Sequence, residues 1–330
     1  TIYYNPAGVA ASNGINLMLD GNFAIRHATF EPAYDGVQGE NEDPADAPGA
    51  NYSEGTLTNF AAAPMIGATA SFPLGDSVGL SFGAGFFVPF GGSAIWSKND
   101  DFEDHPDYAG PYDGGQRWYS IDGTIRTMYV SGAVGLSISK LFHIGVSSGI
   151  AISQIDSLRA RNGVGADNNI ETEQRAWLNA SSIDPQLGAG LMFTPLDGDL
   201  RIGASYQAPP GFGRIALTGT LSGINEAPEA ELHQTLPDVI RAGVSYQFTK
   251  DFQLRLHGDV TRWSLFDDQC IAAEGEPCEV NEDGSNKEGN PTVNLPRRWQ
   301  DAFGVRLGAS YWFTPDVEAV IGVGYDSNAI

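Results

Sequence analysis

Apolar and polar side chains alternate strictly along the segment from Val239 to Trp263. Three residues, Thr249 to Asp251, separate two alternating runs, whose apolar positions are Ile240, Ala242, Val244, Tyr246, Phe248, Phe252, Leu254, Leu256 and Val260. A period of two places successive side chains on opposite faces of a β-strand. The segment is therefore predicted to form a hairpin of two strands, each with one apolar face and one polar face.

The same organisation recurs along the chain, and we count about eleven strands. They are expected from about Ile15 to Phe30, up to Phe72, from Val78, from Trp118 to Ser139, from Phe142, on both sides of Pro195–Asp199, in the hairpin, and on both sides of Thr314–Asp316. Short turns alternate with long polar loops. Aromatic residues lie beside the short turns, at Phe72, Phe142, Phe193, Phe248, Phe252 and Phe313.

These regularities predict an all-β fold, a transmembrane antiparallel β-barrel of the bacterial outer membrane that crosses the bilayer many times. Short turns at one end, long loops at the other and aromatic girdles are typical of such barrels. A soluble sandwich would also alternate, but its polar face would be rich in Lys and Glu. Here that face is mostly Gly, Ser and Gln. The chain has no run of eighteen apolar residues that would form a spanning helix.

The net charge of -23 argues against nucleic acid as a partner, because binding it needs clustered Lys and Arg. The acids gather between strands, at Glu40, Glu42, Asp43, Asp46, Asp100, Asp101, Glu103, Asp104 and Asp107. Two interpretations stay open, solvated loops or divalent-cation bridges to lipopolysaccharide phosphates. The spacing matches no calcium-loop pattern.

Cys270 and Cys278 lie in one polar loop, and we expect a disulfide that closes it. A zinc site would need two more ligands, and the loop has no histidine. The five histidines of the chain accompany no G-x-S-x-G motif. We therefore expect no enzyme activity, no cofactor and no metal.

The third predicted strand, from Val78, contains several residues that disturb a ladder. They are Gly83, Gly85, Pro89, Gly91 and Gly92. Proline cannot donate to a central ladder, and glycines within strands mark bulges or close approach. We expect this strand to be bent or broken, and an ordinary bulge is the alternative.

Several segments resemble the FadL-type family of outer-membrane transporters, which includes fatty-acid channels and channels for toluene-like hydrocarbons. They are YYNPAGVA at 3–10, FGAGFFVPFGG at 82–92, VTRWSLFD at 260–267, RRWQDAFGVRLGASYWFTPD at 297–316 and GVGYDSNAI at 322–330. Each motif is short, but their order and spacing cover nearly the whole chain.

The resemblance implies a fourteen-stranded barrel plugged by an N-terminal hatch. Residues 1–13 would be the end of the hatch and residues 14–330 strands one to about eleven. We expect further strands after Ile330, because single-chain bacterial barrels have even strand numbers. Hydrophobic substrate would leave sideways through a gap at the kinked third strand. The implied gate and plug residues are Asn5, Pro6, Ala7, Gly83, Gly85, Pro89 and Gly91.

Some family members meet a fatty-acid carboxylate with basic groups, but Ser153 and Gln300 fall near those positions here. Arg241, Arg255 and His257 face the predicted lumen instead. They would contact a ligand or pair with acids such as Asp259. The expected function is passive transport of long-chain fatty acids or hydrocarbons, with outer-membrane lipid and lipopolysaccharide as surroundings. The alternative is a structural or surface-binding barrel that transports nothing.

Overall fold

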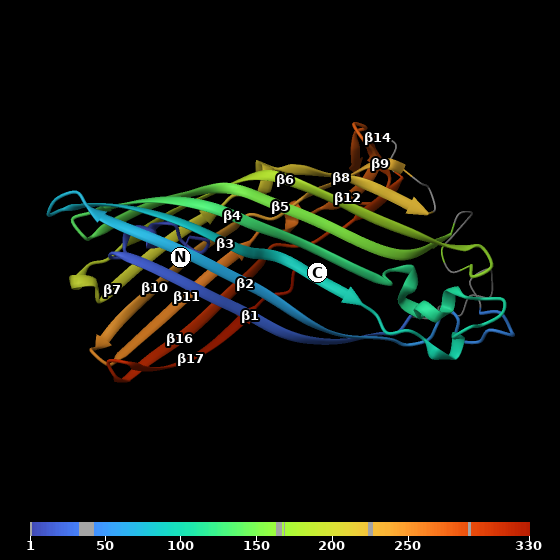
Figure 1. Ribbon diagram of the computed structural model, residues 1–330, viewed down its shortest axis with the longest axis horizontal. Coiled ribbons are helices and arrows are strands. Elements are labelled where there is room, and N and C mark those ends of the chain that lie inside the picture. The colour runs from blue at the N-terminus through green and yellow to red at the C-terminus, as the bar shows by residue number, and fades with distance from the viewer. Residues whose placement is uncertain (1, 33–42, 163–166, 168, 224–226, 290–291) are drawn as a thin grey trace.

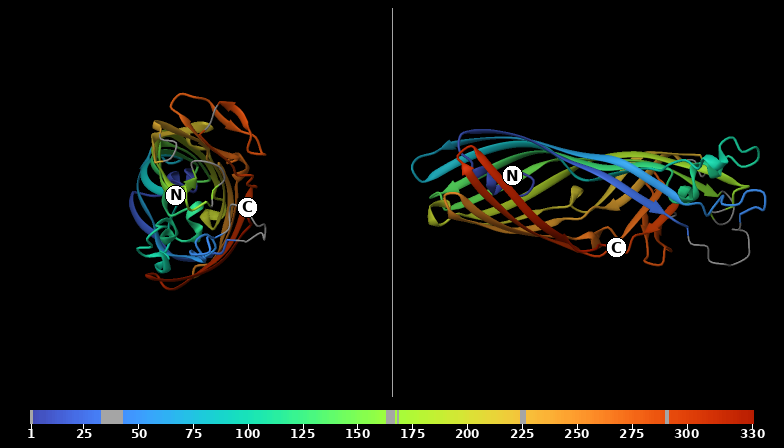
Figure 2. Two further views of the ribbon diagram at one scale, coloured as in Figure 1. Left: turned by 90° about the vertical axis from the view of Figure 1, so that its right-hand side faces the viewer. Right: turned by 90° about the horizontal axis from the view of Figure 1, so that it is seen from below.

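One large antiparallel sheet curls around the long axis of the molecule (Figures 1 and 2). The structure is a computed structural model that describes residues 2–32, 43–162, 167, 169–223, 227–289 and 292–330. Two of the predicted acidic residues, Glu40 and Glu42, lie outside the described residues. Figure 1 shows short turns at one end of the sheet, here called the turn end, and long connections at the other, the loop end.

Neighbouring strands are hydrogen-bonded in the order β1-β2-β3-β4-β5-β6-β7-β10-β11-β16-β17. This path contains eleven strands within the described residues, as predicted. Their bounds are β1 Ile15–Phe30, β2 Gly55–Pro73, β3 Val78–Ile95, β4 Asp122–Ile138, β5 Phe142–Asn162, β6 Glu173–Phe193, β7 Leu200–Gln207, β10 Val239–Thr249, β11 Phe252–Thr261, β16 Ala302–Thr314 and β17 Val317–Asp326. The predicted hairpin is confirmed, since β10 pairs with β11 from Val239 and Thr261 to Thr249 and Phe252.

Further strands continue the wall toward the loop end. They are β8 Arg214–Gly223, β9 Ala227–Thr235, β12 Asp268–Ala273 and β15 Val293–Pro296, with a small separate pair of β13 Cys278–Val280 and β14 Asn286–Gly289. β6 shows how the wall is divided: residues 188–193 pair with β7, whereas residues 176–181 pair with β8. The interruption at 208–213 contains Pro209 and Pro210, which cannot donate to a ladder.

The outer face of the sheet is apolar, which is the reverse of a soluble protein. On β5, Ile144, Val146 and Ile150 are 40–47% exposed, whereas the intervening inward positions are small or polar. This is the arrangement that a hydrocarbon surrounding requires. Within the described residues, no helix is both long enough and apolar enough to cross a bilayer.

The N-terminal segment, residues 2–13, lies inside the curl of the sheet, as the end-on view in Figure 2 shows. It contains the one-turn helix α1, Ala7–Ala10, whose residues Ala7, Val9 and Ala10 are buried. Ile2 and Val9 join an apolar cluster with Phe87 and Tyr129 of the wall. The segment therefore packs against the inner face of the wall.

The acidic segment after β3 folds into three short 3-10 helices, η1 Asp100–Phe102, η2 Gly110–Asp113 and η3 Gly115–Trp118. Arg117 of η3 is fully buried and donates from Nε to the Glu173 carboxylate at 2.9 Å. Burial lowers the pKa of the Arg117 guanidinium, and the Glu173 carboxylate opposes that shift. This ion pair fastens the loop to the loop end of β6.

Cys270 and Cys278 are joined by a disulfide that links β12 to β13. Arg214 on β8 donates to both carboxylate oxygens of Asp268 and to the Cys278 carbonyl. Among the described residues, no cluster of three or more His, Cys, Asp or Glu side chains would hold a metal ion.

Candidate functional site

Asn5 binds the N-terminal segment to the wall. Its Nδ2 donates to the Leu191 carbonyl of β6 at 3.1 Å and to the Ala204 carbonyl of β7 at 3.3 Å. Its Oδ1 accepts the backbone N–H of Ala7 at 2.9 Å. One side chain therefore bridges two strands and orders the start of α1.

Two wall glycines make room for this segment. A Cβ atom at Gly145 would lie 2.2 Å from the Pro6 carbonyl carbon, and one at Gly190 would lie 2.0 Å from Asn5 Oδ1. Gly145 and Gly190 are cross-strand neighbours on β5 and β6. The predicted residues Asn5, Pro6 and Ala7 are thus seated against a patch of wall without side chains.

The ladder between β2 and β3 stops partway along the wall. It runs from Pro73 and Gly79 to Ile66 and Phe86, and beyond these residues the two segments meet again only at an isolated bridge between Leu57 and Trp96 among the described residues. β3 continues to pair with β4, but Val88 and Pro89 form a bulge there. Within the interruption, the side chain of Asn59 on β2 donates from Nδ2 to the Ser93 carbonyl at 2.7 Å.

The residues predicted for the kink therefore differ in how they pair with the neighbouring strands. Pro89 lies in the bulge. Gly83 and Gly85 lie in the regular part of the ladder, opposite Thr69 and Gly67. Gly91 pairs regularly with β4. Glycine retains its N–H and can pair normally, whereas proline has none to donate. The interruption accordingly lies on the loop-end side of Gly85.

A cavity of about 630 Å³, here called the central cavity, lies at this interruption. Ala63, Pro64 and Met65 of β2 form one edge, and Val88, Pro89 and Phe90 of β3 form the other. Tyr3, Tyr4, Arg241, His257, Asp259 and Trp263 are among the residues that complete the lining. The cavity thus joins the interruption, the N-terminal segment and two of the predicted lumen residues.

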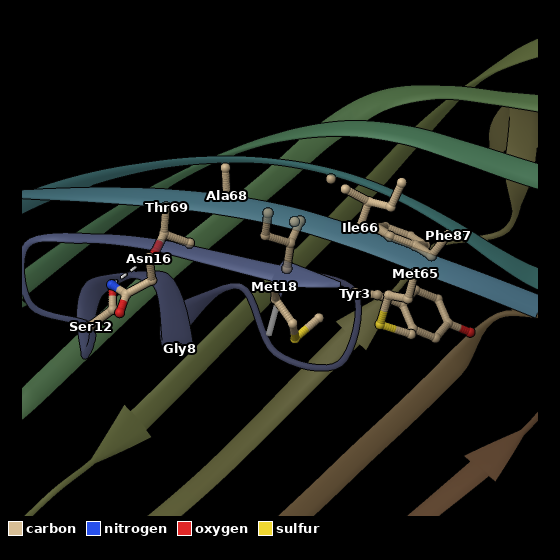
Figure 3. Close-up of a pocket in the computed structure, with 13 residues that line it drawn as sticks. Tyr3, Gly8, Ser12, Asn16, Met18, Met65, Ile66, Ala68, Thr69 and Phe87 are labelled. Atoms are coloured by element: carbon tan, nitrogen blue, oxygen red, sulfur yellow. Dashed lines mark hydrogen bonds between the residues drawn. The ribbon is translucent and has the colours of Figure 1, made fainter. Parts of the chain in front are cut away.

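A smaller cavity of about 250 Å³ adjoins the N-terminal segment on the turn side of the interruption. Figure 3 shows Tyr3, Met65 and Phe87 at one end of it. These three residues also line the central cavity. Ser12, Asn16 and Thr69 supply the polar groups at the other end. The two cavities therefore share an apolar boundary.

The three predicted lumen residues have different surroundings. Arg241 stacks on the Tyr3 ring, with Cζ 4.4 Å from the ring centroid, and donates to the Tyr3 carbonyl at 3.4 Å. His257 lies 3.8 Å from Asp259. Arg255 does not line the central cavity but lines an adjoining one of about 240 Å³, together with Arg241 and His257. Arg241 therefore contacts the N-terminal segment itself.

The acid expected to pair with Arg241 has a different partner. Asp259 lies directly opposite Arg241 in the ladder, yet its carboxylate pairs with Arg306 of β16 at 2.6 Å. Arg306 also binds Asp326 at 2.6 Å. Arg306 is thus paired with neighbouring acids, whereas the guanidinium of Arg241 is positioned by its cation–π contact with Tyr3.

Three arginines line a cavity of about 140 Å³ at the loop end, here called the loop-end cavity. They are Arg159, Arg161 and Arg297, and their neighbours include Ile155, Leu178, Leu221, Leu232 and Ile271. Among the described carboxylates, only that of Asp167 lies within 4 Å of this group, 3.6 Å from Arg161. The buried Nε of Arg297 has no hydrogen-bond partner. The lining of the cavity thus combines apolar side chains with an excess of positive charge.

This arginine group was not predicted from the sequence. A signal was present, because Arg159 and Arg161 are two residues apart and so share one face of a strand. Arg297 comes from the distant segment before β16, and only the folded wall brings it to the same cavity.

Solved structures share this fold. A FadL homologue of Pseudomonas aeruginosa aligns with a TM-score of 0.77 and 18% identity, over 98% of this chain and 74% of that chain. The toluene transporter TbuX of Ralstonia pickettii aligns with a TM-score of 0.64 and 16% identity, over 99% of this chain and 81% of that chain. The toluene transporter TodX of Pseudomonas putida aligns with a TM-score of 0.61 and 16% identity, over 99% of this chain and 78% of that chain. A search of curated proteins finds no match.

Sequence identities this low show a shared fold only, but a family model also matches the chain. The model described as "Outer membrane protein transport protein (OMPP1/FadL/TodX)" matches residues 1–330, which is the whole chain. The curled sheet, its apolar outer face and the segment inside it agree with that assignment and confirm the predicted fold class. This protein therefore belongs to the OMPP1/FadL/TodX family and is a bacterial outer-membrane β-barrel transport protein.

Proposed function

We propose that this protein carries hydrophobic small molecules across the outer membrane by passive diffusion and releases them sideways between β2 and β3. One observation carries the proposal. The β2–β3 ladder stops at Ile66 and Phe86, the two segments meet again only at the isolated Leu57–Trp96 bridge, and unpaired strand edges between these points line the central cavity. The cavity and the interruption of the wall coincide.

An interruption of this kind is costly in a membrane protein. Backbone groups without partners in hydrocarbon cost several kcal/mol each. A structural barrel would gain nothing from such a break, whereas a channel needs an exit. A hydrophobic solute gains roughly 0.8 kcal/mol for each CH₂ that leaves water, so a sideways exit into lipid is downhill. The names of the similar structures, a FadL homologue and two toluene transporters, support the same substrate class.

The loop-end cavity favours amphipathic acids over neutral hydrocarbons. Its arginines lie beside apolar side chains, and among the described residues only the Asp167 carboxylate lies within 4 Å of them. An ion in apolar surroundings is stabilised by a charge-assisted hydrogen bond to a counter-ion. A carboxylate head on an alkyl chain supplies both the charge and the apolar body. We therefore propose fatty carboxylic acids as the substrate class.

The N-terminal segment is proposed to be the plug of the channel, with residues 14–330 as the wall. Asn5, Pro6 and Ala7 fix its position, and Arg241 of β10, the strand beside β7, holds it through Tyr3. The apolar outer face is proposed to contact outer-membrane lipid, and the loop end to meet lipopolysaccharide. No covalent step is needed, because the substrate only changes its surroundings.

Deleting Pro89 tests the exit. Val88 and Pro89 together oppose a single residue, Met128, on β4. Removing one of them restores regular pairing and lets β3 rejoin β2, while Phe90 still opposes Thr127. Uptake of a radiolabelled long-chain fatty acid by a transporter-deficient bacterium should fall at least about tenfold. Pro89→Ala, which keeps the extra residue, should retain most of the uptake.

Two results would count against the proposal. Wild-type uptake no greater than that of the empty host would favour a structural or surface-binding barrel. Full uptake by the Pro89 deletion, with the heat-modifiable gel mobility of a folded barrel, would exclude exit through this interruption.

A further inference from the structure

We propose that Phe90 and Trp263 form a constriction between the loop-end cavity and the central cavity, and that this ring pair limits the width of the molecules that pass. The inference rests on the proposed transport function and adds two specificity-determining residues to it. Phe90 lies on β3, and Trp263 begins the short helix η6, Trp263–Leu265, which follows β11.

The bulge in β3 directs Phe90 into the lumen. Phe87 opposes the buried Tyr129, and Phe90 opposes the buried Thr127, with one β4 residue between these two positions. Strict alternation from Phe87 would send residue 90 to the lipid face, because a shift of one residue exchanges the faces of a strand. The extra residue at 88–89 therefore brings a second aromatic ring inside.

Trp263 is held firmly, and Phe90 meets it edge to face. The two ring centroids are 5.8 Å apart with planes at 73°. Trp263 also packs against Trp299 at 5.0 Å and Phe266 at 6.2 Å, and these two rings contact each other at 5.0 Å. Three mutually packed rings thus form one side of the constriction, and Phe90 alone forms the other.

Contacts of the pair connect the linings of the two cavities. No described residue lines both the loop-end cavity and the central cavity. Phe90 lines the central cavity and packs against the apolar cluster that contains Ile155 and Leu178, which line the loop-end cavity. Trp263 also lines the central cavity and packs against Phe266. Arg297, which lines the loop-end cavity, lies over the Phe266 ring.

A molecule moving between the cavities along this line must pass the ring pair. A straight alkyl chain is narrower than an aromatic ring system and needs only a small displacement of Phe90. A fused-ring substrate must separate the two rings, and it loses their mutual attraction. The energy of one aromatic pair corresponds to about a 2- to 12-fold change in rate.

The test compares uptake of dodecanoic acid with uptake of a pyrene-labelled fatty acid by cells that express each variant. Phe90→Ala and Trp263→Ala should raise the ratio of pyrene-labelled to straight-chain uptake about 2- to 12-fold. The double variant should show little further increase, because both changes remove the same contact. Phe90→Leu keeps an apolar side chain if the alanine variant does not fold, and its ratio should also rise.

Phe23→Ala is the matched control. Phe23 and Phe60 form a ring pair with the same 5.8 Å separation, but both side chains are more than 60% exposed on the outer face. This variant should keep the wild-type ratio. A wild-type ratio in folded Phe90→Ala and Trp263→Ala, with wild-type uptake intact, would overturn the constriction alone. Absence of wild-type uptake would overturn the transport proposal and the constriction with it.

Discussion

Replacing Gly145 by alanine tests how the N-terminal segment is seated. A Cβ atom there would lie 2.2 Å from the Pro6 carbonyl carbon and 2.4 Å from the Ala7 nitrogen. Ordinary Cβ contacts begin at about 3.4 Å, so the segment must withdraw from β5 by more than about 1 Å. Both obstructing groups are backbone, and therefore no side-chain rotation relieves the overlap.

The size of the effect follows from overpacking. Added methyl groups in well-packed interiors cost about 1–3 kcal/mol. This cost shifts the equilibrium between the seated and the displaced segment by about 5- to 140-fold. Withdrawal also strains the Asn5 hydrogen bonds to the Leu191 and Ala204 carbonyls. We expect Gly145→Ala to populate a displaced plug while the wall stays folded, because the three atoms nearest to the added methyl group all belong to the N-terminal segment.

Conductance of the purified protein in planar lipid bilayers measures this displacement. Open events should become about 5- to 140-fold more frequent in Gly145→Ala, approaching those of a variant that lacks residues 2–11. Gly132→Ala is the control, because its Cβ would lie 3.9 Å from the nearest atoms. If folded Gly145→Ala conducts no more often than wild type, the seating of the segment against Gly145 is refuted.

Three further changes probe the loop end. Arg297→Gln should weaken uptake of a fatty acid about tenfold relative to a neutral hydrocarbon of equal length, as competition uptake would show. Glu173→Gln leaves the buried Arg117 without its carboxylate and should destabilise the loop by about 3–5 kcal/mol, so that external protease cleaves near η3. Cys278→Ser opens the short loop from Cys270, and its loss of about 2–3 kcal/mol should lower the thermal unfolding temperature in non-reducing buffer only.

Local pattern was enough for the hairpin around Lys250. Alternation assigned the apolar positions of β10 and β11, and a three-residue gap left the chain no other short connection. The structure narrows the turn to Lys250 and Asp251, because Thr249 pairs with Phe252. The disulfide between Cys270 and Cys278 could also be predicted locally, since the two cysteines are only eight residues apart.

The interruptions of the wall, between β7 and β8 and within β3, could not be predicted from the local sequence pattern. The interruption between β7 and β8 lies where β6 changes its partner, at residues 182–187, and the pairing partner of a strand is not encoded in its own alternation. Pro89 signalled a disturbance in β3, but the sequence did not distinguish its position from those of Gly83 and Gly85. Only the register with β2 and β4 shows that both glycines pair normally.

The sequence by itself determined the faces of the strands, the short turns and the class of protein, because these depend on neighbours two to ten residues apart. The tertiary structure decided which charges meet and which rings face the lumen. Asp259 binds Arg306 rather than Arg241, and Phe90 points inward because two residues oppose one on β4. Such choices depend on the register between strands far apart in the chain, where a shift of one residue exchanges the inner and outer faces.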